Sequence, residues 1–273
     1  MALTQPPDQD IVVVGASGDL SSRKLLPALY NLSAEGLLPR RGNVVGAAPM
    51  PWSTDDFIAF ARDAVEKFSR TKPVERKLAA FTSRLRFVAL DPASKLTDLR
   101  SALRRQRRLV YLAVPPSAFE TLITEVGTSG LADGTSLVIE KPFGHDLASA
   151  RHLNDTIHSV LPEQRVFRID HYLGKETVQN LLVFRFGNSI FERIWNRDAI
   201  ARVEITVAES LGVEQRGAFY EQTGAIRDIV QNHVFQVVAV TAMEPPVSLD
   251  AEAIRNEKVK VLRALQPVNP ADV

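Results

Sequence analysis

The chain has 273 residues, of which 45% are apolar and 24% charged, with 33 basic and 32 acidic side chains. This length predicts a globular protein of one large domain or two. The balanced charge argues against non-specific binding of nucleic acid, and the lack of cysteine excludes a disulfide framework, a thiolate nucleophile and a Cys-ligated metal.

Two further classes of protein are excluded by the distribution of apolar residues. No apolar run approaches the ~20 residues that a membrane-spanning helix needs. The first residues lack the basic region and apolar core of a signal peptide. We therefore expect a cytoplasmic protein with no membrane partner and no metal.

The first 170 residues alternate between short apolar runs and longer amphipathic stretches. Residues 11–14 are Ile-Val-Val-Val, which predicts a buried parallel strand. Leucines at helical spacing follow over 25–32, and the capping and acidic residues of 53–56 predict a second helix start. Further strands are expected at 43–48, 86–90, 109–114, 136–140 and 166–169, and further helices around 95–106, 117–127 and 146–160. This alternation predicts a parallel sheet with helices on both faces.

The pattern changes after about residue 175. Val203, Ile205 and Val207 alternate with less apolar neighbours, which predicts a half-buried antiparallel strand. An apolar stripe over 226–237 predicts a helix. We therefore expect a Rossmann-like α/β domain over 1–175 and an α+β antiparallel-sheet domain over 176–273.

One local cluster of basic residues stands out, the run Arg104, Arg105, Arg107 and Arg108. It has no interleaved aromatic residues on which bases would stack. We predict a solvated helix face there and no nucleic-acid partner.

The segment 15–20, Gly-Ala-Ser-Gly-Asp-Leu, joins the first predicted strand to a helix. Glycines let the backbone approach a pyrophosphate, and the helix N-terminus offers N–H donors to it. The spacing is G-x-x-G rather than G-x-G-x-x-G, so an ordinary turn stays open on spacing alone. The strand before and the helix after favour a dinucleotide site.

The end of the second predicted strand usually selects the dinucleotide. An acidic residue there binds a ribose hydroxyl of NAD, and a basic one favours the 2′-phosphate of NADP. Residues 46–51 are Gly-Ala-Ala-Pro-Met-Pro, with neither charge. The residues alone therefore leave the choice between NAD and NADP open.

Ionisable side chains cluster where the last strand of the first region is expected to end. Asp170, His171, Tyr172 and Lys175 fall there, and ligands of open α/β sheets bind at the carboxyl ends of strands. The pattern fits an anion site with a supported general base. A polar strand-to-helix turn fits it equally well.

The five histidines differ in their surroundings. Three lie in or beside the predicted helix 146–160 and are expected to be solvated: His145, His152 and His158. His233 lies in an apolar helical stripe, where a satisfied core histidine is the commoner outcome. Asp228 precedes it by five positions, about 140° around an ideal α-helix, so the two are not expected to share a face.

Several long motifs in order resemble the glucose-6-phosphate dehydrogenase family. They cover nearly the whole chain: GASGDLSSRKLLPALYNL at 15–32, YLAVPP at 111–116, EKPFG at 140–144, RIDHYLGKE at 168–176, FERIWNR at 191–197, RDIVQNH at 227–233, AMEPP at 242–246 and RNEKVKVL at 255–262.

The resemblance implies oxidation of glucose 6-phosphate at C1 to 6-phosphogluconolactone, the first step of the oxidative pentose phosphate pathway, with hydride transfer to NAD(P). His233 would be the general base, since the ordinary histidine pKa of ~6.5 suits that task, and Asp170 would orient it. The implied substrate-binding residues are His171, Tyr172, Lys175, Glu209, Asp228 and Lys141. The implied coenzyme-binding residues are Gly15, Ser17, Gly18, Asp19, Leu20 and Lys141, and the Lys141–Pro142 bond is expected to be cis.

The chain departs from the family pattern at the coenzyme. Pro49 stands where NADP-using members carry arginine, so a 2′-phosphate would lose its planar cationic partner. Four cations could substitute for it: Arg23, Lys24, Arg40 or Arg41. We expect a weakened preference for NADP and use of NAD.

The chain is also shorter than members of that family. Residues 176–273 would then be only the N-terminal part of the second domain, with an exposed strand edge and apolar face. On that interpretation the chain would be poorly soluble or weakly active alone, and it would form the family's homo-oligomer only with the missing part.

Two alternative functions stay open at this point. One is a non-catalytic truncated paralogue that binds a ligand or a partner subunit. The other is a sugar oxidoreductase of the Gfo/Idh/MocA type, which also has a Rossmann domain and a Glu-Lys-Pro motif.

Overall fold

The computed structural model describes residues 4–91, 95–208, 217–266 and 271. Its Cα packing divides the chain into two compact units, Met1–Ile169 and Asp170–Val273. The functional boundary at residue 175 stays a prediction.

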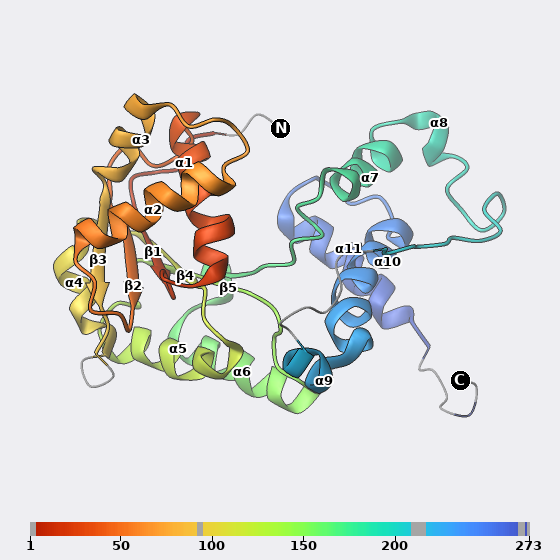
Figure 1. Ribbon diagram of the computed structural model, residues 1–273. Coiled ribbons are helices and arrows are strands. Elements are labelled where there is room, and N and C mark those ends of the chain that lie inside the picture. Colours follow the sequence, from red (N-terminus) through yellow and green to blue (C-terminus); the bar gives the residue numbers. More distant parts are fainter. Residues whose placement is uncertain (1–3, 92–94, 209–216, 267–270, 272–273) are drawn as a thin grey trace. The chain divides into compact units, whose positions relative to one another are not determined.

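The first unit contains one sheet of six parallel strands in the order β3-β2-β1-β4-β5-β6 (Figure 1). This 3-2-1-4-5-6 order is that of the Rossmann fold, and it confirms the predicted α/β class. The strands are β1 (Asp10–Val14), β2 (Val44–Ala48), β3 (Leu85–Ala89), β4 (Arg108–Leu112), β5 (Thr135–Ile139) and β6 (Val166–Arg168).

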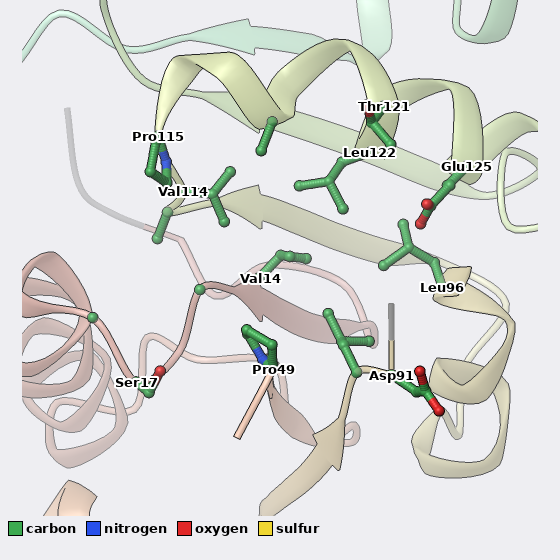
Figure 2. A pocket seen from close by; sticks show the side chains of 15 residues that line it. Val14, Ser17, Pro49, Asp91, Leu96, Val114, Pro115, Thr121, Leu122 and Glu125 are labelled. Atoms are coloured by element: carbon green, nitrogen blue, oxygen red, sulfur yellow. The ribbon is translucent and has the colours of Figure 1, made fainter. Parts of the chain in front are cut away.

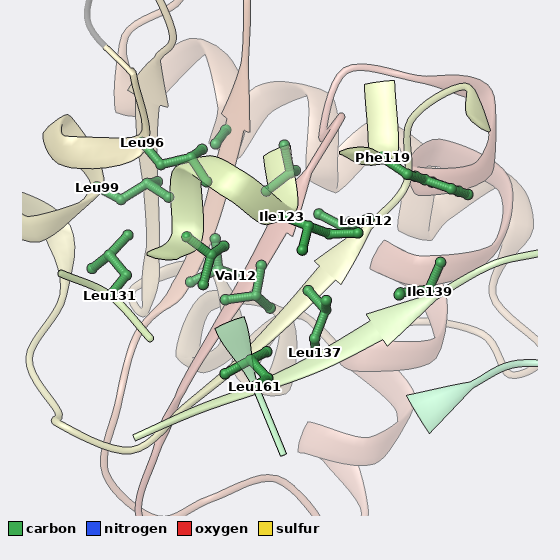
Figure 3. Close-up of a cluster of buried hydrophobic side chains, with 14 of the residues drawn as sticks. Val12, Leu96, Leu99, Leu112, Phe119, Ile123, Leu131, Leu137, Ile139 and Leu161 are labelled. Atoms are coloured by element: carbon green, nitrogen blue, oxygen red, sulfur yellow. The ribbon is translucent and has the colours of Figure 1, made fainter. Parts of the chain in front are cut away.

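Helices cover both faces of this sheet. On one face lie α1 (Leu26–Ala34), α2 (Thr54–Phe68) and α3 (Glu75–Thr82); on the other lie α5 (Phe119–Thr128) and α6 (Leu147–Val160), with the short α4 (Leu99–Ala102) beyond β3 (Figure 1). Alternate residues of β1 enter two separate cores. Val12 and Val14 pack in the core beneath α5 and α6 (Figure 3), whereas Ile11 and Val13 pack beneath α1 and α2.

Helix α2 begins where the sequence predicted. The Asp56 N–H donates to Ser53 Oγ at 3.1 Å, and the Ser53 N–H donates to Asp56 Oδ2 at 2.8 Å. This reciprocal pair is a capping box. The hydrogen bonds with Ser53 also lower the pKa of Asp56 below its usual value.

The prediction of a solvated arginine helix is wrong. The helix ends at Ala102, and Arg108 begins β4, opposite Asp10 of β1. Arg108 is buried, and its guanidinium donates to Gln106 O and Asp133 O. Pairing with β1 and β5 therefore overrides the local run of basic residues.

Asp10 ties three segments together at the amino edge of the sheet. It is fully buried. Its Oδ1 accepts the Asn43 N–H at 2.7 Å, and its Oδ2 accepts the N–H groups of Arg104 and Arg105, each at 2.6 Å. One carboxylate thus satisfies three backbone donors from the loops before β2 and β4.

We expect Asp10→Ala to lower the free energy of unfolding by about 3 kcal/mol or more, since buried unpaired donors cost about 1–3 kcal/mol each. Urea unfolding followed by circular dichroism measures this. The control is Asp8→Ala, which removes an exposed carboxylate bonded to the Arg41 N–H and should change stability by less than about 0.5 kcal/mol. Equal effects of the two substitutions would contradict the role of Asp10.

The regular secondary structure described in the second unit is helical. The helices are α7 (Glu176–Phe186), α8 (Ser189–Glu192), α9 (Gly217–Ala225), the π-helix η6 (Ile226–Val234), α10 (Phe235–Ala242) and α11 (Ala251–Ala264). The strand predicted around Val203–Val207 is absent, because residues 201–208 have no regular structure. An alternating pattern supplies one apolar face, but a strand also needs partners for its backbone groups, and none pairs with it in the described part. No described helix is long and apolar enough to span a membrane.

Arg185 of α7 holds α10 in place, a role that the sequence analysis missed. The side chain is buried. Its guanidinium donates to Val240 O at 2.7 Å and to Met243 O at 2.8 Å, and it lies 5.2 Å from the ring centroid of Trp195. These bonds satisfy carbonyl groups at the end of α10, the helix that continues η6.

Candidate active site

The loop after β1 requires glycine at position 15. Gly15 has φ +89°, and a Cβ there would lie 2.3 Å from Ala113 O, the carbonyl that follows β4. The N–H groups of Gly15 and Ala16 both donate to Ala47 O at the end of β2. The chain therefore turns between β2 and β4 with no room for a side chain, which leaves the backbone open to a ligand.

A cleft of about 520 Å³ lies at this carboxyl edge of the sheet (Figure 2). This volume is typical of a small-molecule site. Apolar side chains such as Val14, Leu96 and Leu122 line much of it, and Ser17 and Gly18 of the loop form one border. A helical segment begins directly after Gly18, and the first N–H groups of a helix are available to a pyrophosphate. The residues present fit a dinucleotide.

The cleft contains no cation for a 2′-phosphate among the described residues that line it. Pro49, directly after β2, lines the cleft together with the carboxylates of Asp91 and Glu125 (Figure 2). Arg40 and Arg41 precede β2 and so lie at the opposite, amino edge of the parallel sheet.

The remaining two candidate cations also lie outside the lining. Arg23 pairs with Asp19 at 3.3 Å and sits 5.6 Å from the centre of the Phe68 ring. Lys24 is exposed. Neither is among the residues that line the cleft.

The EKP segment follows β5 at the same edge of the sheet. Its Lys141–Pro142 bond is cis, as expected. Glu140 accepts a hydrogen bond from the Tyr111 hydroxyl of β4. Burial and the neighbouring Glu140 carboxylate raise the pKa of Tyr111, so this phenol stays a donor and fixes the residue before Lys141.

A tight turn gathers the ionisable residues that open the second unit. The N–H groups of Leu173, Gly174 and Lys175 each donate to the carbonyl three residues earlier. Lys175 then precedes the first turn of α7. The side chains of residues 170–175 therefore lie around a turn and closer together than they would along an extended strand.

Asp170 and His233 form a hydrogen-bonded pair from segments far apart in the sequence. His233 Nδ1 lies 2.6 Å from Asp170 Oδ1, and the same oxygen accepts the Tyr172 N–H at 2.9 Å. Because a carboxylate can only accept, Nδ1 carries the proton and neutral His233 has its lone pair on Nε2. Nε2 is buried and has no hydrogen-bond partner among the described residues, so its lone pair is unsatisfied in this structure.

Aromatic contacts hold the His233 ring. Tyr172 stacks on it with centroids 4.1 Å apart at 14°, and His171 meets it edge-on at 4.6 Å. Lys175 Nζ lies 3.6 Å from the centre of the Tyr172 ring. His171 and Lys175 are exposed, so two potential cations border the fully buried imidazole.

The prediction that Asp228 and His233 point to different faces is wrong. It assumed an α-helix, whereas Ile226–Val234 is a π-helix, in which residues five apart are neighbours along the axis. Both side chains are buried. The π-helix thus brings Asp228 to the face that carries His233.

Two further predictions concern single side chains. The three histidines expected to be solvated, His145, His152 and His158, are exposed. Glu209, an implied substrate-binding residue, lies outside the described residues.

One group of potential metal ligands occurs within the described ranges. Asp170, His171 and His233 each place a ligand atom within 4.8 Å of the others. The hydrogen bond of Asp170 to His233 and the packing of the rings account for this grouping without a metal.

Lys258 of α11 was missed by the sequence analysis. It is half-buried, and burial lowers the pKa of its ammonium below the ordinary value. The signal was present, since Ile254, Lys258 and Leu262 repeat at i, i+4 and i+8 on an otherwise apolar stripe. Helical spacing places apolar side chains on the buried face of a helix. A lysine that falls on that face therefore indicates a buried charge.

Comparison with known proteins agrees with this geometry. Residues 12–180 match the family model "Glucose-6-phosphate dehydrogenase, NAD binding domain", and residues 182–273 match the model of the C-terminal domain. The chain belongs to the glucose-6-phosphate dehydrogenase family. The resemblance inferred from the motifs is confirmed, and the first unit is the part that matches the family's NAD-binding domain.

Curated relatives and solved structures agree. The chain is 45% identical over 271 residues to glucose-6-phosphate 1-dehydrogenase of Rhizobium meliloti, covering 97% of this chain and 55% of the relative. It is 43% identical to that of Bacillus subtilis, covering 100% and 58%. The chain therefore spans little more than half the length of these relatives.

Two solved structures share the fold. A glucose-6-phosphate dehydrogenase in complex with its substrate glucose 6-phosphate superposes with a TM-score of 0.88 at 36% identity, covering 100% of this chain and 59% of that one. The enzyme from Mycobacterium avium gives 0.85 at 36% identity, covering 97% and 59%.

Proposed function

We propose that this chain takes part in oxidising glucose 6-phosphate at C1 to 6-phosphogluconolactone, with NAD(P) as hydride acceptor. The observation that carries the proposal is the Asp170–His233 pair, whose buried Nε2 has no partner in the described part of the chain. Removal of a hydroxyl proton requires a base with an available lone pair, such as this one.

The proton step is assigned to His233. Nε2 accepts the C1 hydroxyl proton, and Asp170 stabilises the imidazolium through Nδ1–H. The electron pair of the C1–H bond leaves as hydride, and C1 becomes the lactone carbonyl. When bound, NAD(P)⁺ supplies the electrophilic nicotinamide carbon that takes the hydride.

The substrate phosphate is assigned to the residues around the dyad. Lys175 is an exposed cation, and His171 is an exposed side chain of the same turn that becomes a cation when it is protonated. The ring of Tyr172 contacts both the His171 ring and the Lys175 ammonium. Charge-assisted hydrogen bonds would fix a phosphate there. Asp228 and Glu209 are proposed to accept hydrogen bonds from sugar hydroxyls, and Lys141 to contact substrate and nicotinamide.

Both alternative functions are less well supported. The Gfo/Idh/MocA type is disfavoured because the two matching family models belong to glucose-6-phosphate dehydrogenase. A non-catalytic role is disfavoured because the dyad is intact.

The test is a direct assay of the 273-residue chain. Glucose 6-phosphate with NAD or NADP should give reduced coenzyme, measured by absorbance, and 6-phosphogluconate after hydrolysis of the lactone. Separately, glucose 6-phosphate should raise the melting temperature, and glucose should not, because it lacks the phosphate. Absence of both turnover and stabilisation would refute the proposal.

We expect the chain to use NAD more efficiently than NADP. Pro49 and two carboxylates line the cleft, and no described lining residue is cationic. Pro49→Arg should raise the ratio of kcat/KM for NADP over NAD by about 10- to 100-fold, the value of a charge-assisted hydrogen bond.

The matched control is Met50→Arg, which adds the same charge one residue further on, at an exposed side chain outside the lining. It should shift the ratio far less. A wild-type chain that already uses NADP at least as efficiently as NAD would contradict the expectation.

A further inference from the structure

The EKPFG segment, residues 140–144, follows β5 and carries Lys141 at its second position. The segment has no regular secondary structure, and Lys141 is half-buried. A lysine has a flexible four-carbon stem, so the place of its ammonium depends first on a fixed backbone. The contacts that the neighbouring residues of this segment make therefore bear directly on what Lys141 can reach.

Tyr111 of β4 contacts the start of the segment from the neighbouring strand. Tyr111 pairs with Val138 of β5, and residues two apart along a strand point to the same face. Glu140, two residues after Val138, accepts a hydrogen bond from the Tyr111 hydroxyl. Burial and this bond raise the pKa of Tyr111, so the phenol is a donor at neutral pH and well above it.

Phe143 is held from the opposite face of the sheet. Its ring packs against the core beneath α5 and α6, and the guanidinium of Arg168 lies 4.9 Å from the ring centroid. Tyr111 lies on the other face, since it lines a pocket together with residues of the core beneath α1 and α2. The segment is thus fixed at Glu140 on one face and at Phe143 on the other, with Lys141 between them.

We propose that Tyr111 is a positioning residue for Lys141: its hydroxyl fixes Glu140 and thereby the backbone that carries the lysine. The catalytic meaning rests on the proposed function, in which Lys141 contacts substrate and nicotinamide. Tyr111 is not among the described residues that line the coenzyme cleft, so its effect passes through the segment. Groups at a reacting centre must be held closely in place, and this bond supplies part of that support.

The primary test needs no turnover. Reductive ¹³C-methylation gives each lysine of the 273-residue chain an NMR signal, and Lys141→Arg identifies the signal of Lys141. In the wild type this signal should lie apart from those of the exposed lysines, because Lys141 is half-buried. Tyr111→Phe keeps the ring, removes the donor and should move the signal towards them. Glu140→Gln keeps an oxygen acceptor for the hydroxyl and should leave the signal in place.

The matched control is Tyr30→Phe. Tyr30 is buried in the same unit, and its hydroxyl oxygen accepts the Val74 N–H at 2.9 Å. Removing this hydroxyl leaves a backbone donor unpaired and should lower the melting temperature, yet the Lys141 signal should stay in place. An unmoved signal in Tyr111→Phe, or an equal movement in Tyr30→Phe, would overturn the proposal.

Kinetics of glucose 6-phosphate oxidation test whether Tyr111 acts through Lys141. Tyr111→Phe should lower kcat/KM by about tenfold or more, and Tyr30→Phe should leave it within about twofold of the wild type. A residue that acts only through another has no effect once the other is gone. The double variant Tyr111→Phe/Lys141→Met should therefore match Lys141→Met within about twofold. Effects that multiply would overturn the proposal.

The two kinds of measurement distinguish this proposal from the proposed function. A moved Lys141 signal in a chain without turnover or ligand-induced stabilisation would support the role of Tyr111 and refute the proposed function. Turnover with an unmoved signal would support the proposed function and overturn the role of Tyr111. If Tyr111→Phe fails to fold, Glu140→Met removes the acceptor instead and must move the signal in the same direction.

Discussion

His233→Asn is expected to lower kcat for glucose 6-phosphate oxidation by about 10²- to 10⁴-fold, the usual contribution of a general base. Asparagine can still donate to Asp170 but has no lone pair of comparable basicity at the position of Nε2. The turn that carries the cationic side chains is untouched, so the KM for the sugar should change by less than about fivefold.

Steady-state kinetics at several pH values measure this effect. The loss of kcat in the variant should be present at every pH at which the wild type is active. His152→Asn is the matched control, because it makes the same change at an exposed histidine paired with Glu120. Activity within tenfold of the wild type in His233→Asn would exclude His233 as the base.

Gly15→Ala is expected to weaken coenzyme binding by more than about 100-fold. The added Cβ would lie 2.3 Å from Ala113 O, so the loop or the end of β4 must move. The positive φ adds strain of about 1–2 kcal/mol for any residue with a Cβ. Movement of this loop removes the backbone surface on which a pyrophosphate would rest.

Gly36→Ala is the control that separates the effect of backbone strain from the effect of steric overlap in Gly15→Ala. Gly36 also has a positive φ, +74°, but a Cβ there meets nothing within 4 Å. It should reduce stability by about 1 kcal/mol and leave the affinity for coenzyme unchanged. Titration calorimetry with NAD and NADP gives the affinities, and circular dichroism shows whether Gly15→Ala still folds. Wild-type affinity in Gly15→Ala would contradict the assignment of the loop.

The sequence predicted the first unit well because burial dominates there. Strands such as β1 are apolar on both faces, and the local signals, from the Ser53 cap to Gly15, agree with the global fold. The predictions of secondary structure were wrong where pairing between strands decides whether a segment forms a strand. Arg108 belongs to a polar run but begins a strand, and the segment around Ile205 has the pattern of a strand without a described partner.

The candidate site was predicted in its residues but not in its geometry. Motifs located Asp170 and His233, yet no pattern within either segment shows that residues 63 positions apart are hydrogen-bonded. The relation of Asp228 to His233 was wrong because an α-helical period was assumed. Lys258 was overlooked because only its place on an apolar stripe indicates that it is half-buried.

The π-helix Ile226–Val234 has a consequence for sequence change in this family member. Since i→i+5 bonding aligns Asp228 with His233, the number of residues between them is itself part of the site. Deleting one intervening residue would remove no functional group, yet it would restore an ordinary helical period and change the direction of one side chain relative to the other. The number of residues in this segment is therefore constrained as strictly as their identity. We expect insertions and deletions there to be tolerated less than conservative substitutions.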